Sequence, residues 1–359
     1  MHDITPFSGS YLPDDIQFLL KPIQIEMTPV EVKEKLIQSG ARHYSDMLSQ
    51  EPAPTEHHLT LFARALDQGA TRMAREVVML AKALINRFGD TPIVLASLVR
   101  AGVPLGVMLH HTLRALGKTS FHYGISIIRD RGIDEVALSY IEQKHGTEGL
   151  VFVDGWTGKG AITGELTRSL QGRPGYPELP RLVVLADPCG CSWLSATDDD
   201  WLIPFGIMGA PVSGLVSRSL WSEKGLHGCV HCEHLQEFEC SQLLVNTVAD
   251  CRQQLDLSQI PAAEWDYQQN AALRIQSHQV VKKMAEQFEI NSVNRIKPGI
   301  AEATRAVLRR VPDHVLVRHI DDPDVSLLVY LAKQKKIAIK EVGNELGQYR
   351  AITIIKKVI

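Results

Sequence analysis

The sequence predicts an α/β fold with a parallel sheet, a helical N-terminal region before it and a small α/β unit after it. Short apolar runs alternate with helical segments between residues 91 and 254, which is typical of a parallel sheet covered on both faces. The chain has 359 residues, more than a single core usually holds, so we expect more than one unit. The C-terminal segment also differs in charge from the rest of the chain, because residues 295–359 hold 13 Lys and Arg against 7 Asp and Glu.

Helices are expected to dominate the N-terminal region, residues 1–90. Thr28-Pro29 is a favourable helix start, with Thr as N-cap and Pro at the first helical position. Apolar residues at helical spacing predict a helix over 56–88 that ends near Gly89. In the sheet region, 91–254, we expect strands at 92–98, 121–128, 150–153 and 181–186, and helices at 107–116 and 161–170.

Residues 255–294 are expected to form a polar linker helix, and residues 295–359 a unit of their own. For this last unit we expect helices at 299–310 and 324–333 and strands at 314–317, 337–342 and 351–357. Its net charge is +6, whereas residues 1–294 carry −9. Such an asymmetry indicates a nucleic-acid-facing segment on an acidic body.

Composition places the chain among ordinary folded proteins, with 45% hydrophobic and 22% charged residues. The N-terminus does not have the pattern of a secretory signal, and no window approaches the roughly 18 apolar residues of a membrane span. We therefore expect a cytoplasmic protein without a membrane partner. The six cysteines lie between Cys189 and Cys251, too few for a disulfide scaffold, so thiols or metal ligands are expected.

A glycine-rich loop follows the third expected strand, in the stretch VFVDGWTGKGAIT. Asp154 ends the apolar run, and Gly155, Gly158 and Gly160 allow a ligand to approach the backbone before the next helix begins. Ligands of open α/β sheets bind beyond the carboxyl ends of the strands. The loop matches neither the Walker A pattern nor the dinucleotide fingerprint, but it predicts a phosphate site with an acid placed for ribose hydroxyls.

This loop resembles the phosphoribosyl-pyrophosphate loop of the type I phosphoribosyltransferases, with Gly155 in place of their second acid. The stretch SLVRAGVPLG resembles their pyrophosphate loop, and ISIIRDRGID falls where they have a mobile catalytic flap. Together with WLIPFG and VSGLVSR, these runs resemble a bacterial stress-operon (tellurium-resistance-associated) phosphoribosyltransferase-like family with a C-terminal pelota-type RNA-binding domain. The same family is also catalogued as StiP-type cysteine proteases.

The resemblance implies an enzyme that uses phosphoribosyl pyrophosphate, or a nucleotide, with Mg²⁺ to form or cleave an N-glycosidic bond. It names no acceptor base and no direction of reaction. The implied catalytic residues are Asp154, Arg129 and Arg131. The implied substrate-binding residues are Arg100, Ala101, Gly102, Gly155, Trp156, Thr157, Gly158, Lys159, Gly160 and Asp187. A homodimer is expected, and a non-catalytic nucleotide- or RNA-binding protein is the alternative.

The cysteines leave other interpretations open. Cys229-x-x-Cys232 and Cys189-x-Cys191 together supply four soft ligands, enough for a tetrahedral zinc. A cysteine protease-type hydrolase would use Cys229 or Cys189 with a histidine brought near by the fold. The third interpretation is that these thiols are simply buried.

The C-terminal unit opens with a Lys297-Pro-Gly turn before a helix that bears Arg305, Arg309 and Arg310. This arrangement resembles the pelota and ribosomal kink-turn-binding domains, and the resemblance implies that these four side chains approach an RNA backbone. Structured RNA is read largely through shape and phosphate, for which basic side chains suffice. We expect structured RNA as a partner; the alternative is a solvated helix face on a dimerisation domain.

Overall fold

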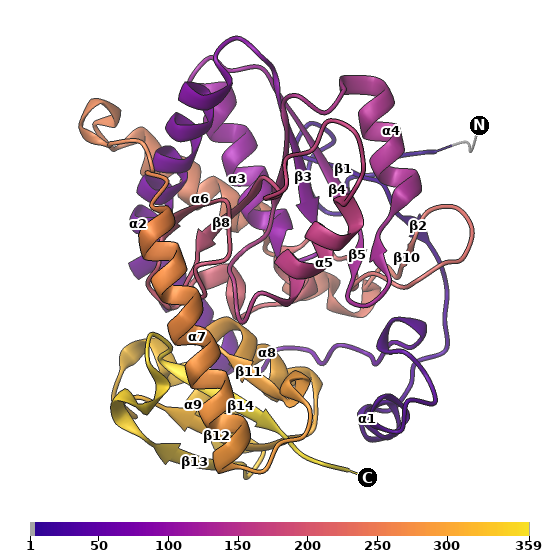
Figure 1. Cartoon of the computed structure of the whole chain (residues 1–359), viewed down its shortest axis with the longest axis vertical. Helices are drawn as coiled ribbons and strands as arrows, with labels where there is room; N and C mark the ends of the chain where they lie inside the picture. Colours follow the sequence, from indigo (N-terminus) through magenta and orange to yellow (C-terminus); the bar gives the residue numbers. More distant parts are fainter. Residues whose placement is uncertain (1–3, 359) are drawn as a thin grey trace.

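The computed structural model describes residues 4–358 and places an α/β body above a smaller C-terminal unit (Figure 1). The body is built on a six-stranded sheet in the order β1-β4-β3-β7-β8-β9, in which neighbouring strands run parallel. The mixed α/β fold with a parallel sheet is thereby confirmed. The strands are β1 (Gln17–Phe18), β3 (Ile93–Leu98), β4 (Ser120–Ile125), β7 (Leu150–Val153), β8 (Leu182–Ala186) and β9 (Leu194–Thr197).

Helices cover both faces of this sheet. Ile93 and Leu95 of β3 share a core with one helical layer, whereas Val94 and Ala96 share a core with the other. Strands buried on both sides must be apolar throughout, which explains the continuous hydrophobic runs. The first layer holds α2 (Glu56–Phe88), α3 (Gly102–Ala115) and α6 (Ser241–Gln253), and the second holds α4 (Glu135–His145) and α5 (Ala161–Leu170).

The N-terminal region differs from the expected helical cap. Helix α2 begins and ends at the predicted residues, but Met73, Val77 and Leu84 on its apolar side are fully buried in the core of the body. A stripe of this kind requires a packing partner, so the helix becomes a layer of the body instead of a cap. Residues 4–55 are mainly loops and turns. They also hold β1, β2 (Lys21–Pro22), which pairs with β10 (Gly228–Cys229), and the short α1 (Val30–Gln38). Residues Ile127–Ile128 (β5) and Gly132–Ile133 (β6) form a small antiparallel hairpin.

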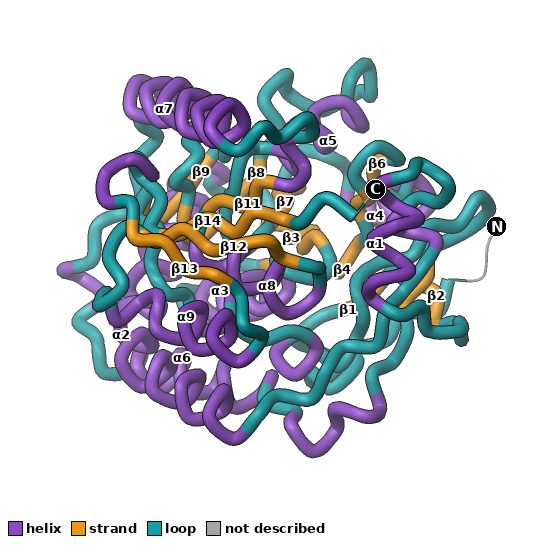
Figure 2. The backbone as a smooth tube through the Cα atoms, turned by 90° about the horizontal axis from the view of Figure 1, so that it is seen from below, coloured by secondary structure: helices purple, strands orange, loops and turns teal. Residues whose placement is uncertain are grey.

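The C-terminal unit has a four-stranded sheet in the order β11-β14-β12-β13 (Figure 2). Helix α7, from the segment expected to be a linker, packs Val280, Val281 and Met284 on one face of this sheet. Residues of α8 and α9 join the core on the other side, which is continuous with the core of the body. The elements are α7 (Tyr267–Gln287), β11 (Ile296–Pro298), α8 (Ile300–Arg309), β12 (Pro312–Val317), α9 (Ser326–Gln334), β13 (Ala338–Glu341) and β14 (Ala351–Ile355).

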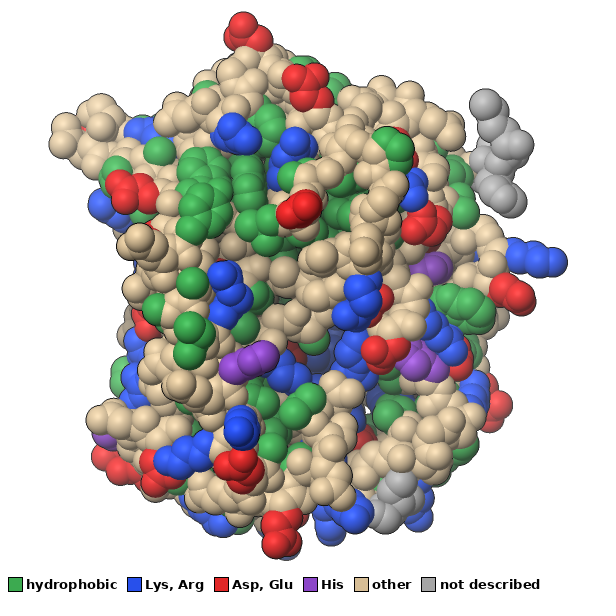
Figure 3. All heavy atoms as spheres, viewed as in Figure 1, with side chains coloured by type: hydrophobic (Ala, Val, Ile, Leu, Met, Phe, Trp, Pro, Cys, Tyr) green, Lys and Arg blue, Asp and Glu red, His purple; other side chains and the backbone are tan. Residues whose placement is uncertain are grey.

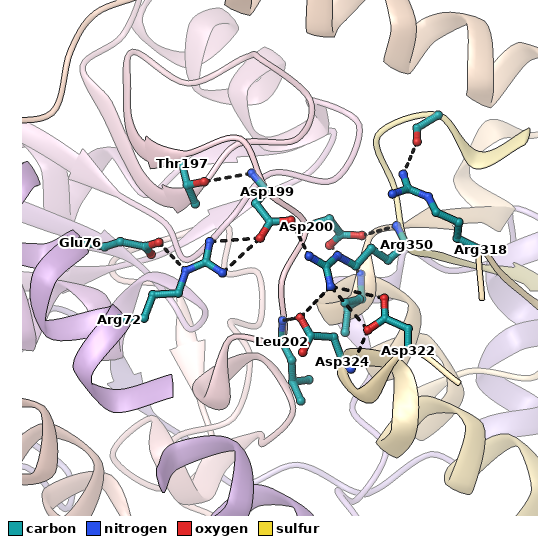
Figure 4. A network of polar contacts seen from close by, with 12 residues as sticks. Arg72, Glu76, Thr197, Asp199, Asp200, Leu202, Arg318, Asp322, Asp324 and Arg350 are labelled. Carbon is teal, nitrogen blue, oxygen red and sulfur yellow. Dashed lines mark hydrogen bonds and ion pairs between the residues drawn. The ribbon is translucent and has the colours of Figure 1, made fainter. Parts of the chain in front are cut away.

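A polar network also joins the two parts (Figure 4). The Arg350 guanidinium lies 2.9 Å from Asp199 of the body and 3.0 Å from Asp324 of the C-terminal unit. Arg72 of α2 reaches the same Asp199 carboxylate at 3.1 Å and binds Glu76 at 2.7 Å. This network and the continuous core fix the C-terminal unit against the body.

No helix within residues 4–358 has both the length and the apolar character to cross a membrane.

Candidate functional site

A cavity of about 740 Å³ lies between the body, the C-terminal unit and the segment around α1. Its walls come from the carboxyl ends of β3 and β7, the loop before α5, and parts of β11 and α8. Figure 3 shows Lys and Arg side chains around a hollow between the upper body and the lower unit. This volume is in the range of small-molecule sites, roughly 300–1,000 Å³.

The glycine-rich loop after β7 forms one wall of the cavity, as the sequence predicts. Asp154, Trp156, Thr157 and Lys159 line it, together with Gly158 and Gly160, whereas Gly155 lies behind them. Burial and the nearby Glu302 carboxylate raise the pKa of Asp154 to about 7, although the Gly155 amide donates to its Oδ1 atom at 2.8 Å. A carboxyl group with such a pKa can hold a proton at neutral pH, so it need not repel an anion.

Of the three arginines expected to contact pyrophosphate, two line the cavity and one lies outside it. Arg100 lines the cavity, but its guanidinium is paired with Glu51. Arg129 also lines it and lies over the Tyr44 ring at 5.2 Å. Arg131 lies outside the cavity, paired with Asp46 and stacked over Trp221 at 4.3 Å.

The residues that follow Arg100 begin helix α3. Ala101 lines the cavity, whereas Gly102 packs against the backbone of β7. A Cβ atom on Gly102 would lie 2.0 Å from the Val153 carbonyl oxygen. Gly102 therefore permits close packing of helix and strand and does not face a ligand.

Asp187 has a supporting position, in contrast to the expected ligand contact. The residue is 0% exposed and lies behind the loop. Its carboxylate accepts hydrogen bonds from the Thr157 hydroxyl at 2.6 Å, the Cys191 amide at 3.0 Å and the Ser192 amide at 2.9 Å. These bonds hold the glycine-rich loop and the turn after β8 in one arrangement.

The basic residues expected to face RNA line the cavity instead. Lys297 of β11, Arg305 and Arg309 of α8, and the following Arg310 are all in its wall. The Arg305 guanidinium stacks over the Trp156 ring at 4.6 Å. Helix α8 packs on the body, which places these four side chains in the cavity wall, and their contact with RNA stays a prediction.

The cysteines fall into distinct environments. Cys189 and Cys191 lie in the turn after β8 behind the loop, where a hydrogen bond from Cys191 lowers the pKa of the Cys189 thiol. Cys229 is 1% exposed within β10, and burial raises its pKa to about 12. Cys232 differs from them because it lines the cavity.

Two histidines, His231 and His234, line the cavity with Cys232. The His234 Nε2 atom lies 2.8 Å from the Glu51 backbone oxygen. A carbonyl oxygen only accepts hydrogen bonds, so Nε2 carries a proton and Nδ1 remains as the basic nitrogen. The histidine- and cysteine-rich segment is recognisable in the sequence, but Cys232 is not, because its access to the cavity depends on the tertiary fold.

The structure does not assemble the proposed zinc ligands. Within residues 4–358, no group of three or more His, Cys, Asp or Glu side chains is placed to hold a metal ion. The Mg²⁺ expected with a phosphoribosyl substrate stays a prediction.

Comparison with known proteins identifies two regions. The family model for the tellurite-like stress resistance cysteine protease StiP matches residues 9–249, and the model for the PELOTA RNA binding domain matches residues 275–357. A relative from Acinetobacter baylyi, named Cysteine protease StiP, is 50% identical over 365 residues. The match covers 98% of this chain and 94% of that relative.

Solved structures give partial and weak matches. A hypothetical protein from Neisseria gonorrhoeae with bound ppGpp has 15% identity and a TM-score of 0.26, over 36% of this chain and 80% of that one. Hypoxanthine phosphoribosyltransferase from Trypanosoma cruzi, complexed with the product IMP, has 13% identity and a TM-score of 0.26. The match covers 35% of this chain and 66% of that one. At these TM-scores the likeness supports no argument about fold or ligand.

The prediction of a phosphoribosyltransferase that uses phosphoribosyl pyrophosphate is therefore wrong. A relative identical at half of the aligned positions is named a cysteine protease, and the family model that matches most of the chain has the same description. The prediction rested on a glycine-rich turn after a parallel strand, and such folds host many unrelated functions. The chain belongs to the family of the tellurite-like stress resistance cysteine protease StiP.

Proposed function

We propose that this protein is a cysteine peptidase and that Cys232 is its nucleophile. The name of the Acinetobacter relative supports the class of reaction. The observation that carries the choice of residue is that Cys232, of the six cysteines, lines the cavity. A thiol can attack a substrate only where the substrate can reach it, and Cys189 and Cys229 lie outside the cavity wall.

The Cys232 thiol needs a proton acceptor. Burial raises its pKa to about 11, with Arg100 opposing the shift and Glu51 adding to it. At neutral pH the resting group is therefore a thiol, whereas the attacking species is a thiolate. His234, with Nε2 held by the Glu51 carbonyl, and His231 are the bases that line the same cavity.

The proposed reaction follows the general scheme of cysteine peptidases. A histidine takes the Sγ proton, and the thiolate attacks the carbonyl carbon of a peptide bond. The C–N bond breaks, the amine leaves with the proton from the histidine, and a thioester forms on Cys232. Water then hydrolyses the thioester, which releases the acid and restores the thiol.

The test compares three single variants of the full-length chain. Cys232→Ser keeps size and polarity but has a poor nucleophile, so hydrolysis of a denatured protein substrate should fall by about 1,000-fold or more. Cys189→Ser and Cys229→Ser are matched controls that should retain the wild-type rate. Thermal melting of each variant verifies that the comparison is between folded proteins.

Mass spectrometry after brief treatment with iodoacetamide gives a readout independent of the substrate. Loss of wild-type hydrolysis should follow alkylation of Cys232. If Cys232→Ser keeps full activity, or if activity disappears in Cys189→Ser instead, the assignment is wrong. A wild-type chain that hydrolyses no denatured protein would count against the peptidase itself.

RNA binding by the C-terminal unit is a second candidate function, supported by the match to the PELOTA domain over residues 275–357. The exposed basic side chains of this unit outside the cavity include Lys333, Lys336, Lys340, Lys356 and Lys357. Binding to structured RNA should weaken steeply with salt, since phosphate contacts release counterions. Replacing Lys336 and Lys340 by Gln should reduce that salt dependence, and an unchanged slope would exclude this face.

A further inference from the structure

The charges that line the cavity are strongly unbalanced. Ten Lys and Arg side chains contribute to its wall, against the three carboxyl groups of Glu51, Asp154 and Glu302. The cations are Lys33, Arg100, Arg129, Lys159, Arg218, Lys297, Arg305, Arg309, Arg310 and Lys335. Like charges held this close repel one another in the absence of a counter-charge.

Protein carboxylates neutralise only part of this set. Arg100 is paired with Glu51, Arg129 with Asp130 at 3.2 Å, and Arg310 with the buried Glu34 at 2.6 Å. Lys335 is exposed, and the remaining six cations come from three separate parts of the chain: Lys33 from α1, Lys159 and Arg218 from the body, and Lys297, Arg305 and Arg309 from the C-terminal unit. Within the part of the chain that the structure describes, none of these six forms an ion pair.

Burial makes the imbalance costly. Arg305 is only 8% exposed and Lys33 only 7%. Burial and neighbouring cations lower the pKa of Arg309 to about 10 and that of Lys297 well below its ordinary value. Unpaired buried charges destabilise a fold, and groups of this kind cluster at functional sites.

We propose that the cavity binds a small polyanion made of linked phosphoryl groups, held jointly by the body, α1 and the C-terminal unit. Arg guanidinium groups match phosphoryl oxygens in a bidentate geometry. The N-terminus of α5 lies in the same wall at Gly160, where the helix has no side-chain cap and its positive end is available to an anion. The unpaired cations that surround it distinguish this site from an ordinary helix end.

The enclosure favours a small ligand over a polymer. The cations line a cavity of about 740 Å³ between packed parts of the protein, so an extended nucleic acid strand could not reach all of them together. A compact polyanion could contact all three parts of the chain at once. Its binding would then add stability to the contact between the body and the C-terminal unit. This inference does not depend on the peptidase assignment.

The experiment measures binding of inorganic tripolyphosphate to the full-length protein by calorimetry at fixed ionic strength. The comparison ligands are sulfate at equal ionic strength and ATP. Tripolyphosphate should bind, whereas sulfate should bind far more weakly. Tighter binding of ATP would assign a nucleoside polyphosphate as the source of the phosphoryl groups, and equal or weaker binding would assign inorganic polyphosphate.

Two variants probe the site and one serves as a control. Lys297→Met and Arg309→Met should each weaken tripolyphosphate binding by about tenfold or more, because each removes a charge-assisted contact. Lys333→Met removes an exposed cation from the same unit outside the cavity, and it should bind as the wild type does. If Arg309→Met does not fold, Lys297→Met and Arg309→Lys supply the comparison.

The ligand-free variants give a signature that a structural role would not produce. Removing one of several repelling cations should raise the melting temperature of Arg309→Met above that of the wild type, although its affinity for tripolyphosphate falls. A lower melting temperature together with wild-type affinity would overturn the proposal. So would equal binding of sulfate and tripolyphosphate, because non-specific attraction would then explain the result.

Discussion

Replacing Asp187 by Ala should destabilise the whole protein, because this carboxylate organises the glycine-rich loop. Asp187 is 0% exposed. It accepts four hydrogen bonds, from the Thr157 hydroxyl, the Cys191 amide, and the amide and hydroxyl of Ser192. Alanine would leave these donors without their acceptor in a place that water does not reach.

The size of the effect follows from these contacts. A hydrogen bond to a charged group contributes about 1.5–3 kcal/mol, but four bonds to one carboxylate are not additive, so we expect a loss of about 4 kcal/mol. Unfolding entropy is about 2.1 cal/mol/K per residue. For 359 residues that share a continuous core, the melting temperature should then fall by about 5 °C.

Differential scanning calorimetry of Asp187→Ala and Asp187→Asn tests this reasoning. Asn keeps the shape and one acceptor oxygen, so its melting temperature should lie between those of Asp187→Ala and the wild type. The sequence-based expectation was instead that Asp187 contacts a ligand. If Asp187→Ala melts like the wild type but loses tripolyphosphate binding, that earlier expectation is right and the supporting role is wrong.

Three further substitutions test other parts of the structure. Arg350→Met should lower the melting temperature by about 2–4 °C in calorimetry, because it leaves the partly buried Asp322 and Asp324 without a cation and Asp199 with Arg72 alone. An unchanged value would show that the contacts of Arg350 contribute nothing. Burial lowers the pKa of Lys33 from 10.5 to about 7. Between these pH values the unfolded chain binds a proton that the folded chain does not, so the stability of the protein rises with pH over this window. Lys33→Met should therefore show a smaller rise in melting temperature from pH 6.5 to pH 9 than the wild type. Gly102→Ala should reduce the free energy of unfolding by about 2–4 kcal/mol in denaturant titration, because the new Cβ atom would lie 2.0 Å from the Val153 carbonyl oxygen. A variant as stable as the wild type would show that α3 can move away from β7 at no cost in free energy.

Local sequence signals were sufficient for the bounds of helix α2, strand β7 and helix α5. The helix over 56–88 has its predicted bounds because Thr55 caps its start, apolar residues recur at helical spacing, and Gly89 ends it. Strand β7 and helix α5 also have their predicted bounds. Strands β1 and β9 were not predicted, because two- and four-residue edge strands with mixed burial contain too little periodicity to recognise.

The candidate site could be predicted only in part, because its composition depends on how distant segments pack. The loop from Asp154 to Gly160 follows a parallel strand, so its place at the sheet edge could be inferred from order alone. Helical spacing placed Arg305 and Arg309 on one side of α8, but it could not tell that this side would pack on the body. Cys232 was indistinguishable from Cys229 in the sequence, because only the tertiary fold gives one of them access to the cavity.

Occupation of the cavity by a polyanion should also protect the thiol of Cys232, since both belong to the same wall. Bound phosphoryl groups would obstruct access to Sγ and would oppose the effect of Arg100, which lowers the thiol pKa. Iodoacetamide is uncharged, so its approach does not depend on the electrostatic field of the cavity. Saturating tripolyphosphate should therefore slow alkylation of Cys232, measured by mass spectrometry, but not that of the partly exposed Cys251, which lies outside the cavity. Equal rates for Cys232 with and without tripolyphosphate would mean that thiol and anion do not share one cavity, even if each is functional.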